Sequence, residues 1–286
     1  MHVIAGVTGH TGAATADALL AGGHAVRVLV RSQEKGAPWK RKGCEVAVAE
    51  LDDPAALARA LEGAQGAYLL SPPNYAATDF LADREAFVGR MVEGVQRSRV
   101  QNFVFLSSIG AQHPAGTGPI VTLHRAEQAL RGVAPSLTFI RAAYFLENWG
   151  AVLPVAKAQG VLPFFGRIDV KFPQVCARDI GAAAARALVA AVGGAHVVEL
   201  SGAQDWSVED VAAAVGALLG KPLKAVGAPV EAARAGLEHA GVPAEMARLF
   251  AEMYAGMASG HVAFERQGAV VRGSTPLADA LRPVVG

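Results

Sequence analysis

Gly6-Val7-Thr8-Gly9-His10-Thr11-Gly12 is the stretch of sequence that decides the fold. It ends an apolar, strand-like run and opens a helix-like one. Glycines at this spacing allow a tight strand-to-helix turn, and they let the backbone N–H groups of a helix start face a pyrophosphate. Because the stretch follows the first strand of an alternating chain, it predicts a dinucleotide-binding loop and not an ordinary turn.

Strand-like and alanine-rich helix-like runs alternate through the first half of the chain. The predicted strands are Val3–Val7, Ala25–Val30, Glu45–Val48, Ala67–Leu70, Asn102–Leu106 and Leu137–Ile140. The predicted helices are Thr11–Ala21, Pro54–Leu61, Phe80–Ser98 and Ile120–Leu130, and Asp53 before Pro54 is a helix-start pattern. This order predicts an α/β protein with a Rossmann-type, doubly wound parallel sheet.

The pattern changes after Asn148. Residues 151–175 are rich in glycine, proline and phenylalanine without a clear period, and a helix near 178–191, a strand at 196–200 and mostly helical segments follow. We expect a Rossmann domain over residues 1–150 and a smaller, mostly helical substrate-side lobe over residues 151–286. The helix at 178–191 is expected to return to the first domain.

Composition narrows the class of protein. The 286 residues are 52% hydrophobic and 18% charged, which provides a buried core, and the net charge of +1 gives no reason to expect a nucleic acid or a membrane as partner. The two cysteines match no metal-ligand spacing, so no metal is expected. No secretory signal and no span of about 20 apolar residues is present, so we expect a cytoplasmic protein. The oligomeric state stays open, a homodimer included.

Arg31, at the end of the second predicted strand, bears on the cofactor. It stands about 20 residues beyond the glycine loop, where an NAD-specific site carries an Asp or Glu on the ribose 2′-hydroxyl. A guanidinium instead pairs with a 2′-phosphate through two parallel hydrogen bonds, and Lys35 follows close behind. The two residues favour NADP(H) over NAD(H). The alternative is an ordinary solvated arginine at a strand end.

Seven strings resemble, in the same order, the NmrA-like family of atypical short-chain dehydrogenases/reductases. They are residues 7–12, 28–31, 50–54, 106–111, 127–131, 141–148 and 177–180, with VTGHTG, LSSIGA and RAAYFLEN the most telling. The resemblance implies an NADP(H)-binding Rossmann domain followed by a small C-terminal domain. Glu50 departs from the family's more frequent aspartate, and Ala142 stands where a proline is common.

The resemblance also implies roles for individual residues. It puts the pyrophosphate on Thr8, Gly9, His10, Thr11 and Gly12, and the 2′-phosphate on Arg31. Gly6, at the start of the glycine loop, and Lys35, close behind Arg31, are expected at the cofactor site from the sequence itself. Adenine is expected near Glu50 and Leu51, and the adjoining ribose near Leu70, Ser71 and Pro72. On the nicotinamide side the implied residues are Ser107, Ser108, Ala143, Tyr144 and Phe145.

The acid–base pair of typical short-chain dehydrogenases is missing from the sequence. They use Tyr-x-x-x-Lys, in which the lysine lowers the pKa of the tyrosine. The residues four positions after the tyrosines are Pro72, Asp79, Asn148 and Ala258. His124 is the remaining candidate proton donor, with Ser107 and Ser108 as further candidate catalytic residues. The alternative is that His124 only orients Glu127 or a ribose.

Two functions fit these residues. The first is an NADPH-dependent reductase that passes hydride to a small quinone-like or conjugated aromatic acceptor, as quinone oxidoreductases and triphenylmethane-dye reductases of this architecture do. The second is a non-catalytic NADP(H)-sensing regulatory protein that binds a protein partner. Both types lack the Tyr/Lys pair, so its absence does not separate them. A sugar-nucleotide epimerase is disfavoured because its chemistry relies on the missing tyrosine. We favour the reductase, whose substrate the sequence does not identify.

Overall fold

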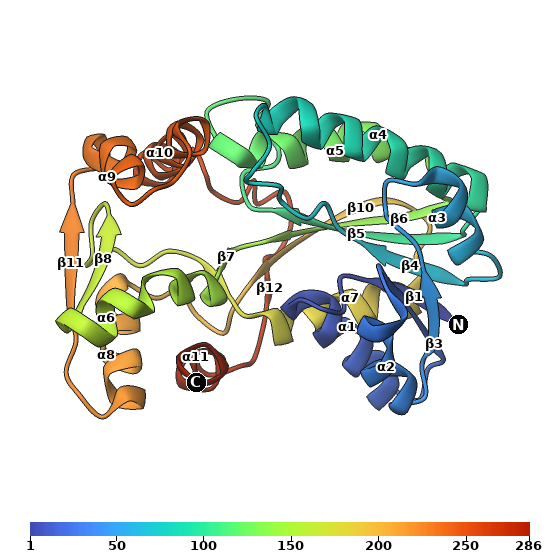
Figure 1. The fold of residues 1–286 in the computed structure, drawn as a ribbon, viewed down its shortest axis with the longest axis horizontal. Coiled ribbons are helices and arrows are strands. Elements are labelled where there is room, and N and C mark those ends of the chain that lie inside the picture. Colours follow the sequence, from blue (N-terminus) through green and yellow to red (C-terminus); the bar gives the residue numbers. More distant parts are fainter. The chain divides into compact units, whose positions relative to one another are not determined.

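The chain forms an eight-stranded parallel sheet in a computed structural model that describes residues 1–286 (Figure 1). In spatial order the strands are β12 (Val271–Arg272), β10 (Gly194–Ser201), β6 (Ser136–Ala142), β5 (Asn102–Ser108), β4 (Gly66–Leu69), β1 (His2–Ala5), β2 (Val26–Val30) and β3 (Glu45–Val48). The winding direction reverses at β1, which pairs in parallel with β2 on one side and β4 on the other. The predicted doubly wound α/β fold is thus confirmed, and the glycine loop follows the strand at the switch point.

The chain divides into two compact units. The first comprises Met1–Ser107, Thr122–Arg141 and Ile180–Val198, and the second comprises Ser108–Val121, Ala142–Asp179 and Glu199–Gly286. The chain therefore crosses between the units several times. The division into domains at residue 150 stays a prediction.

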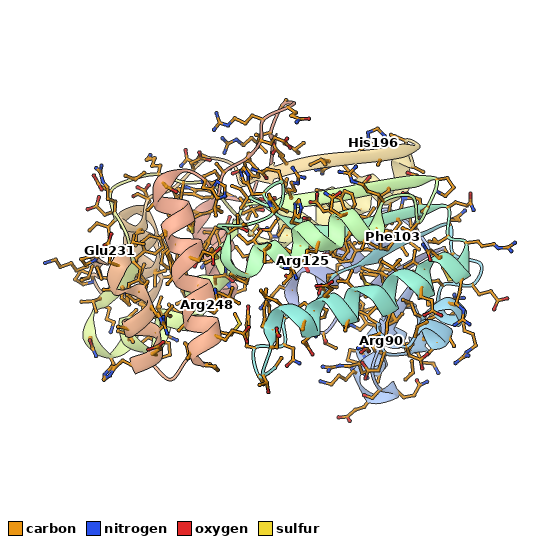
Figure 2. All side chains as sticks on the ribbon, turned by 90° about the horizontal axis from the view of Figure 1, so that it is seen from above. Arg90, Phe103, Arg125, His196, Glu231 and Arg248 are labelled. Atoms are coloured by element: carbon orange, nitrogen blue, oxygen red, sulfur yellow. The ribbon has the colours of Figure 1, made fainter.

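Helices cover both faces of the sheet in the first unit (Figure 1). One face carries α1 (His10–Ala21), α2 (Gln33–Arg41) and α7 (Ala177–Ala190), and the other carries α3 (Pro54–Ala60), α4 (Phe80–Ser98) and α5 (Val121–Leu130). Between the second group and the sheet lies a core that includes Leu57, Met91, Phe105, Leu130 and Phe139. The outward sides of α4 and α5 carry Arg90 and Arg125 (Figure 2), which pair with Asp52 and Glu85.

The local helix signals explain where several elements begin. The carboxylate of Asp53 accepts hydrogen bonds of 3.0 Å from the backbone N–H groups of Ala55 and Ala56, as the helix-start pattern predicts. The predicted bounds of β3 and α4 are confirmed. The helix α2 was missed, because Gly36 and Pro38 interrupt its pattern. It is capped by Ser32, whose hydroxyl accepts a hydrogen bond from the Lys35 N–H.

The second unit has two small parallel sheets and several helices. The strands of these two sheets are β7 (Tyr144–Phe145) with β9 (Gln174–Val175), and β8 (Val161–Phe165) with β11 (Lys224–Ala228). Its α-helices are α6 (Leu153–Gln159), α8 (Val208–Leu219), α9 (Ala233–His239), α10 (Ala244–Ser259) and α11 (Leu277–Val285). Short 3₁₀ helices span Gly118–Ile120, Leu146–Val152 and Val230–Ala232. Residues 151–175, which show no clear period in the sequence, contain α6 and β8, and prolines 154 and 163 lie within these two elements.

None of the helices combines the length and the apolar character that crossing a bilayer requires.

Candidate functional site

Close contacts make the turn after β1 a site for glycine. Gly6 has φ +70°, and a Cβ there would lie 2.7 Å from Cδ2 of Leu70. A Cβ on Gly12 would lie 2.3 Å from the Ala5 carbonyl oxygen, so α1 starts against the end of β1. The N–H of Gly9 donates to the Gly6 carbonyl at 2.9 Å, which closes the turn. These positions match the tight turn and close packing of a dinucleotide-binding loop.

The N-terminus of α1 is available to an anion. Gly9 is its N-cap, no side chain caps it, and its first turn holds no acidic residue. Thr8, Gly9 and His10 are exposed, whereas Thr11 is buried. The first backbone N–H groups of a helix carry partial positive charge and lack intrahelical partners. The residues present therefore fit a pyrophosphate, as the sequence predicted for this loop.

Arg31 and Lys35 follow β2 on the exposed surface, and neither forms an ion pair. Arg27, on the same strand, differs: its guanidinium donates to Glu45 at 2.7 Å and to the carbonyls of Ala60 and Glu62 at 2.8 Å. Arg27, on the strand, is thus used within the fold, whereas Arg31, directly after the strand, is free. A free guanidinium with a lysine close in sequence fits the 2′-phosphate that distinguishes NADP(H).

The residues predicted for adenine and its ribose follow β3 and β4. Glu50 is exposed and Leu51 is buried after β3, while Leu70 and Ser71 are half-buried and Pro72 is exposed after β4. The hydroxyl oxygen of Ser71 is buried without a hydrogen-bond partner. Such an orphaned polar group is a place where a ligand or a water completes the hydrogen bonding.

A buried arginine fixes the turn that carries Ser71 and Pro72. The Arg84 guanidinium donates to the Pro72 carbonyl and pairs with Asp83. It also lies 4.6 Å from the ring centroid of Phe87. These contacts hold the loop after β4 without using any of the side chains predicted to touch the cofactor.

Ser107 belongs to a buried cluster with Glu127 and Arg141. Its hydroxyl donates to Oε1 of Glu127 at 2.5 Å. The Arg141 guanidinium donates to the same carboxylate through Nε at 3.0 Å and Nη2 at 2.7 Å. The exposed fractions are 2% for Ser107, 0% for Glu127 and 4% for Arg141. Sequence reasoning quoted Glu127 and Arg141 within family strings but assigned neither of them this pairing.

The other predicted catalytic residues lie on separate elements. His124 is half-buried on α5, one helical turn before Glu127. The Glu127 carboxylate accepts hydrogen bonds from Ser107 and Arg141. Ser108 is half-buried, and its hydroxyl donates to the Ile109 carbonyl at 3.0 Å. A catalytic role for any of these residues stays a prediction.

Ser108, Ala143, Tyr144 and Phe145 belong to the second unit. Ala143 is buried and donates its N–H to the Leu200 carbonyl at 2.9 Å, whereas Tyr144 and Phe145 form the half-buried β7. The structure groups Ser107 with the cofactor residues predicted on the first unit, from the glycine loop to Pro72. The other four residues predicted for the nicotinamide half belong to the second unit.

Aromatic side chains gather in the second unit. Phe164 stacks on Phe172 at 5.8 Å between centroids, and both meet tyrosines edge-on: Phe172 meets Tyr144 at 5.7 Å and Phe164 meets Tyr254 at 5.5 Å. Burial raises the pKa of Tyr144 and Tyr254, so both phenols are neutral at physiological pH. Sequence analysis named Tyr144 but missed Phe172 and Tyr254, which follow no motif.

Two acidic residues of the second unit have structural roles. Glu147 accepts a hydrogen bond of 2.7 Å from the N–H of Ala177 at the start of α7, which is a capping contact. Asp179 accepts from the hydroxyl of Thr275 at 2.9 Å and from the N–H of Ser274 at 3.2 Å, and its carboxylate is buried. Asp179 therefore secures the chain ahead of α11.

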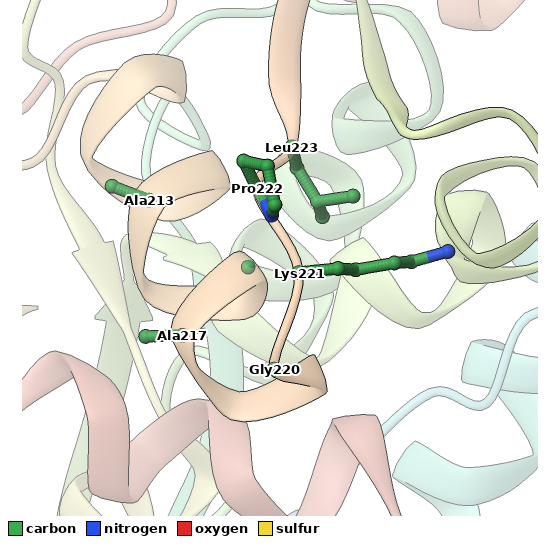
Figure 3. A pocket seen from close by; sticks show the side chains of 7 residues that line it. Ala213, Ala217, Gly220, Lys221, Pro222 and Leu223 are labelled. Atoms are coloured by element: carbon green, nitrogen blue, oxygen red, sulfur yellow. The ribbon is translucent and has the colours of Figure 1, made fainter.

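A separate hollow lies beside the turn between α8 and β11 (Figure 3). It is lined by Ala213, Gly216, Ala217, Gly220, Lys221, Pro222 and Leu223. Lys221 is its only ionisable lining residue, and its ammonium donates to the Lys157 carbonyl. The hollow thus lacks the paired polar groups of a reaction site, and none of the predicted site residues lines it. No group of three or more His, Cys, Asp and Glu side chains could hold a metal ion.

Comparison with known proteins gives the family. The model of the NmrA-like family matches residues 2–268. The chain belongs to the NmrA-like family. This NmrA-like protein is 24% identical to the NAD(P)H azoreductase of Xenophilus azovorans, over 89% of this chain and 86% of the relative.

Two solved structures share the fold of this NmrA-like protein over nearly its whole length. One is the NADPH-dependent quinone oxidoreductase from Escherichia coli complexed with NADPH, with a TM-score of 0.82, 24% identity and 100% of both chains covered. The other is the triphenylmethane reductase of Citrobacter sp. complexed with NADP(H), with a TM-score of 0.79, 19% identity and coverage of 99% of this chain and 100% of the other. At these identities the likeness establishes the fold.

Proposed function

We propose that this protein is an NADPH-dependent reductase that transfers hydride to a small quinone-like or conjugated aromatic acceptor. The observation that carries the proposal is the open N-terminus of α1 followed, after β2, by a free Arg31. Membership of the NmrA-like family supports it, as do the reductase names of the relatives, which include an azoreductase and a quinone oxidoreductase.

The proposed binding roles divide among the carboxyl ends of the strands. Gly6 and residues 8–12 hold the pyrophosphate, and Arg31 with Lys35 holds the 2′-phosphate. Glu50 and Leu51 border the adenine, while Leu70, Ser71 and Pro72 border its ribose. The hydroxyl of Ser71 gains in this way the hydrogen-bond partner that it otherwise lacks. Ser107, Ser108 and residues 143–145 serve the nicotinamide half.

Bound NADPH would supply a hydride, so that the acceptor gains two electrons and one hydrogen while the cofactor becomes NADP⁺. A quinone or a conjugated dye spreads the resulting negative charge over its ring system, and one proton then completes the reduction. This proton comes from water or from His124, since no tyrosine–lysine pair stands in the sequence to supply it. Ser107 is not the donor, because its proton is directed to Glu127.

The experiment is NADPH consumption in the presence of a panel of benzoquinones, naphthoquinones, azo dyes and triphenylmethane dyes. The proposal predicts acceptor-dependent loss of NADPH that is faster than with NADH at equal, subsaturating concentrations. The control is the Arg31→Ala variant, which should lose the difference between the two cofactors. NADPH binding without consumption over the whole panel would contradict the reductase and favour the cofactor-sensing alternative.

A further inference from the structure

Glu127 ties together the carboxyl ends of two neighbouring strands. Its carboxylate takes one hydrogen bond from Ser107, near the end of β5, and two from Arg141, near the end of β6. Glu127 itself stands on α5, the helix that connects these two strands. All three side chains belong to the first unit and are buried, so water does not compete for these bonds.

Each strand end continues directly into residues proposed for the nicotinamide half of the cofactor. Ser108 follows Ser107, and residues 143–145 begin two positions after Arg141. The chain also leaves the first unit directly after Ser107 and directly after Arg141. A contact that fixes both strand ends therefore fixes the starting points of both segments. The adenine-side residues follow β1 to β4 and do not depend on this contact.

The charges of Glu127 and Arg141 determine which groups in the cluster donate hydrogen bonds and which accept them. An ionised carboxylate only accepts hydrogen bonds, and a guanidinium only donates. The Ser107 hydroxyl therefore donates its hydrogen bond to Glu127 and can only accept a hydrogen bond from any further partner. Such a hydroxyl can accept a hydrogen bond from a ribose hydroxyl or a carboxamide N–H, but it cannot stabilise an oxygen anion on a substrate.

We propose that Glu127, paired with Arg141, is a positioning residue that sets Ser107 and the two strand ends for the nicotinamide half of the cofactor. The inference rests on the proposed NADPH site and deepens it. It assigns Ser107 to orientation of the cofactor and not to proton donation.

The test compares two probes in calorimetric titrations. NADPH carries the nicotinamide half, whereas adenosine 2′,5′-bisphosphate carries only adenine, its ribose and the 2′-phosphate. Ser107→Ala and Glu127→Gln should each weaken NADPH about tenfold and leave the bisphosphate within about twofold, because losing one hydrogen bond to the cofactor corresponds to roughly that change. With saturating NADPH, kcat should fall by up to about a hundredfold through misplacement of the nicotinamide.

Ser136→Ala is the matched control. Ser136 is a buried serine at the opposite end of β6, and its hydroxyl donates to Asn102 at the opposite end of β5 at 3.0 Å. This variant loses a buried hydrogen bond between the same two strands but should bind both probes as the native protein does. Should Glu127→Gln fail to fold, Ser107→Ala carries the test, because it leaves the Glu127–Arg141 ion pair intact.

Equal weakening of both probes by Ser107→Ala, or no weakening of either, would overturn the proposal. Failure of the reductase would look different. If the native protein reduces no acceptor while the two probes separate as expected, the positioning role stands and the reductase falls. If acceptors are reduced but the probes do not separate, only the positioning role falls.

Discussion

A Cβ atom on Gly12 would lie 2.3 Å from the carbonyl oxygen of Ala5, so the first helix begins in direct contact with the first strand. Gly9, three residues earlier, differs in this respect. A Cβ there would have only the Gly6 carbonyl oxygen near it, at 3.5 Å, and its φ of −109° suits any residue. The two glycines therefore serve different purposes, one for the fold and one for the proposed ligand.

Gly12→Ala and Gly9→Ala separate these purposes. We expect Gly12→Ala to lower the free energy of unfolding by about 1–3 kcal/mol, since the backbone must shift to admit the methyl group. Gly9→Ala should leave the unfolding free energy of the unliganded protein within about 0.5 kcal/mol but weaken NADPH at least tenfold, because its methyl group would occupy the pyrophosphate position. Urea unfolding and calorimetric titration measure the two effects. Native affinity in Gly9→Ala would show that no phosphate approaches this residue.

The pair formed by Glu127 and Arg141 makes a prediction about stability. Arg141→Met alone should cost about 3–5 kcal/mol of unfolding free energy, because it leaves the buried carboxylate without its cation. The double variant Glu127→Leu with Arg141→Met should recover most of that loss, since it buries no charge. Urea unfolding at pH 7 checks both variants. A double variant as unstable as the single one would mean that the ion pair itself stabilises the fold.

We expect His2 to contribute to the loss of folding stability at acidic pH. Burial, with smaller contributions from the N-terminal ammonium and from His24, lowers the pKa of His2 in the folded protein below its ordinary value of 6.5. Below pH 6.5 the unfolded chain therefore binds this proton first, and the stability falls as the pH drops through the folded pKa. Above pH 6.5 the residue adds no pH dependence. His2→Gln should thus lose less stability than the native protein between pH 7.5 and pH 5, as thermal unfolding would measure.

The exposed His239 supplies the control for that series. His239→Gln should follow the native protein over the same pH range. Parallel curves for the native protein and His2→Gln would show that His2 is not the residue responsible.

Local pattern was sufficient to predict much of the first unit. The glycine loop, the strand and helix periods and the Asp53 cap are encoded by residues close in sequence, so β3 and α4 could be predicted to the residue. α2 was missed because Gly36 and Pro38 lie inside it and lower its helix propensity, although the helix buries Trp39. The sequence singled out Arg31 for the 2′-phosphate, a role that stays a prediction, but it could not show that Arg27 is the basic residue engaged in the fold.

The second unit was harder to predict because its contacts join distant segments. Tyr144, Phe172 and Tyr254 meet through Phe164, although no period or motif connects them. Asp179 likewise accepts hydrogen bonds from Ser274 and Thr275, far along the chain. The buried hydrogen bond between Ser107 and Glu127 could not be predicted from the sequence either, because it depends on how α5 packs against β5.

The most direct test of the account is calorimetric titration of the native protein and of Arg31→Ala with NADPH and NADH. Arg41→Ala, which removes an equal charge from the exposed end of α2, is the matched control. We predict that the native protein and the control bind NADPH at least about tenfold more tightly than NADH, and that Arg31→Ala binds the two alike. Equal affinities in the native protein, or a preference that survives Arg31→Ala, would contradict the assignment of Arg31. Absence of binding to either dinucleotide would contradict the site itself.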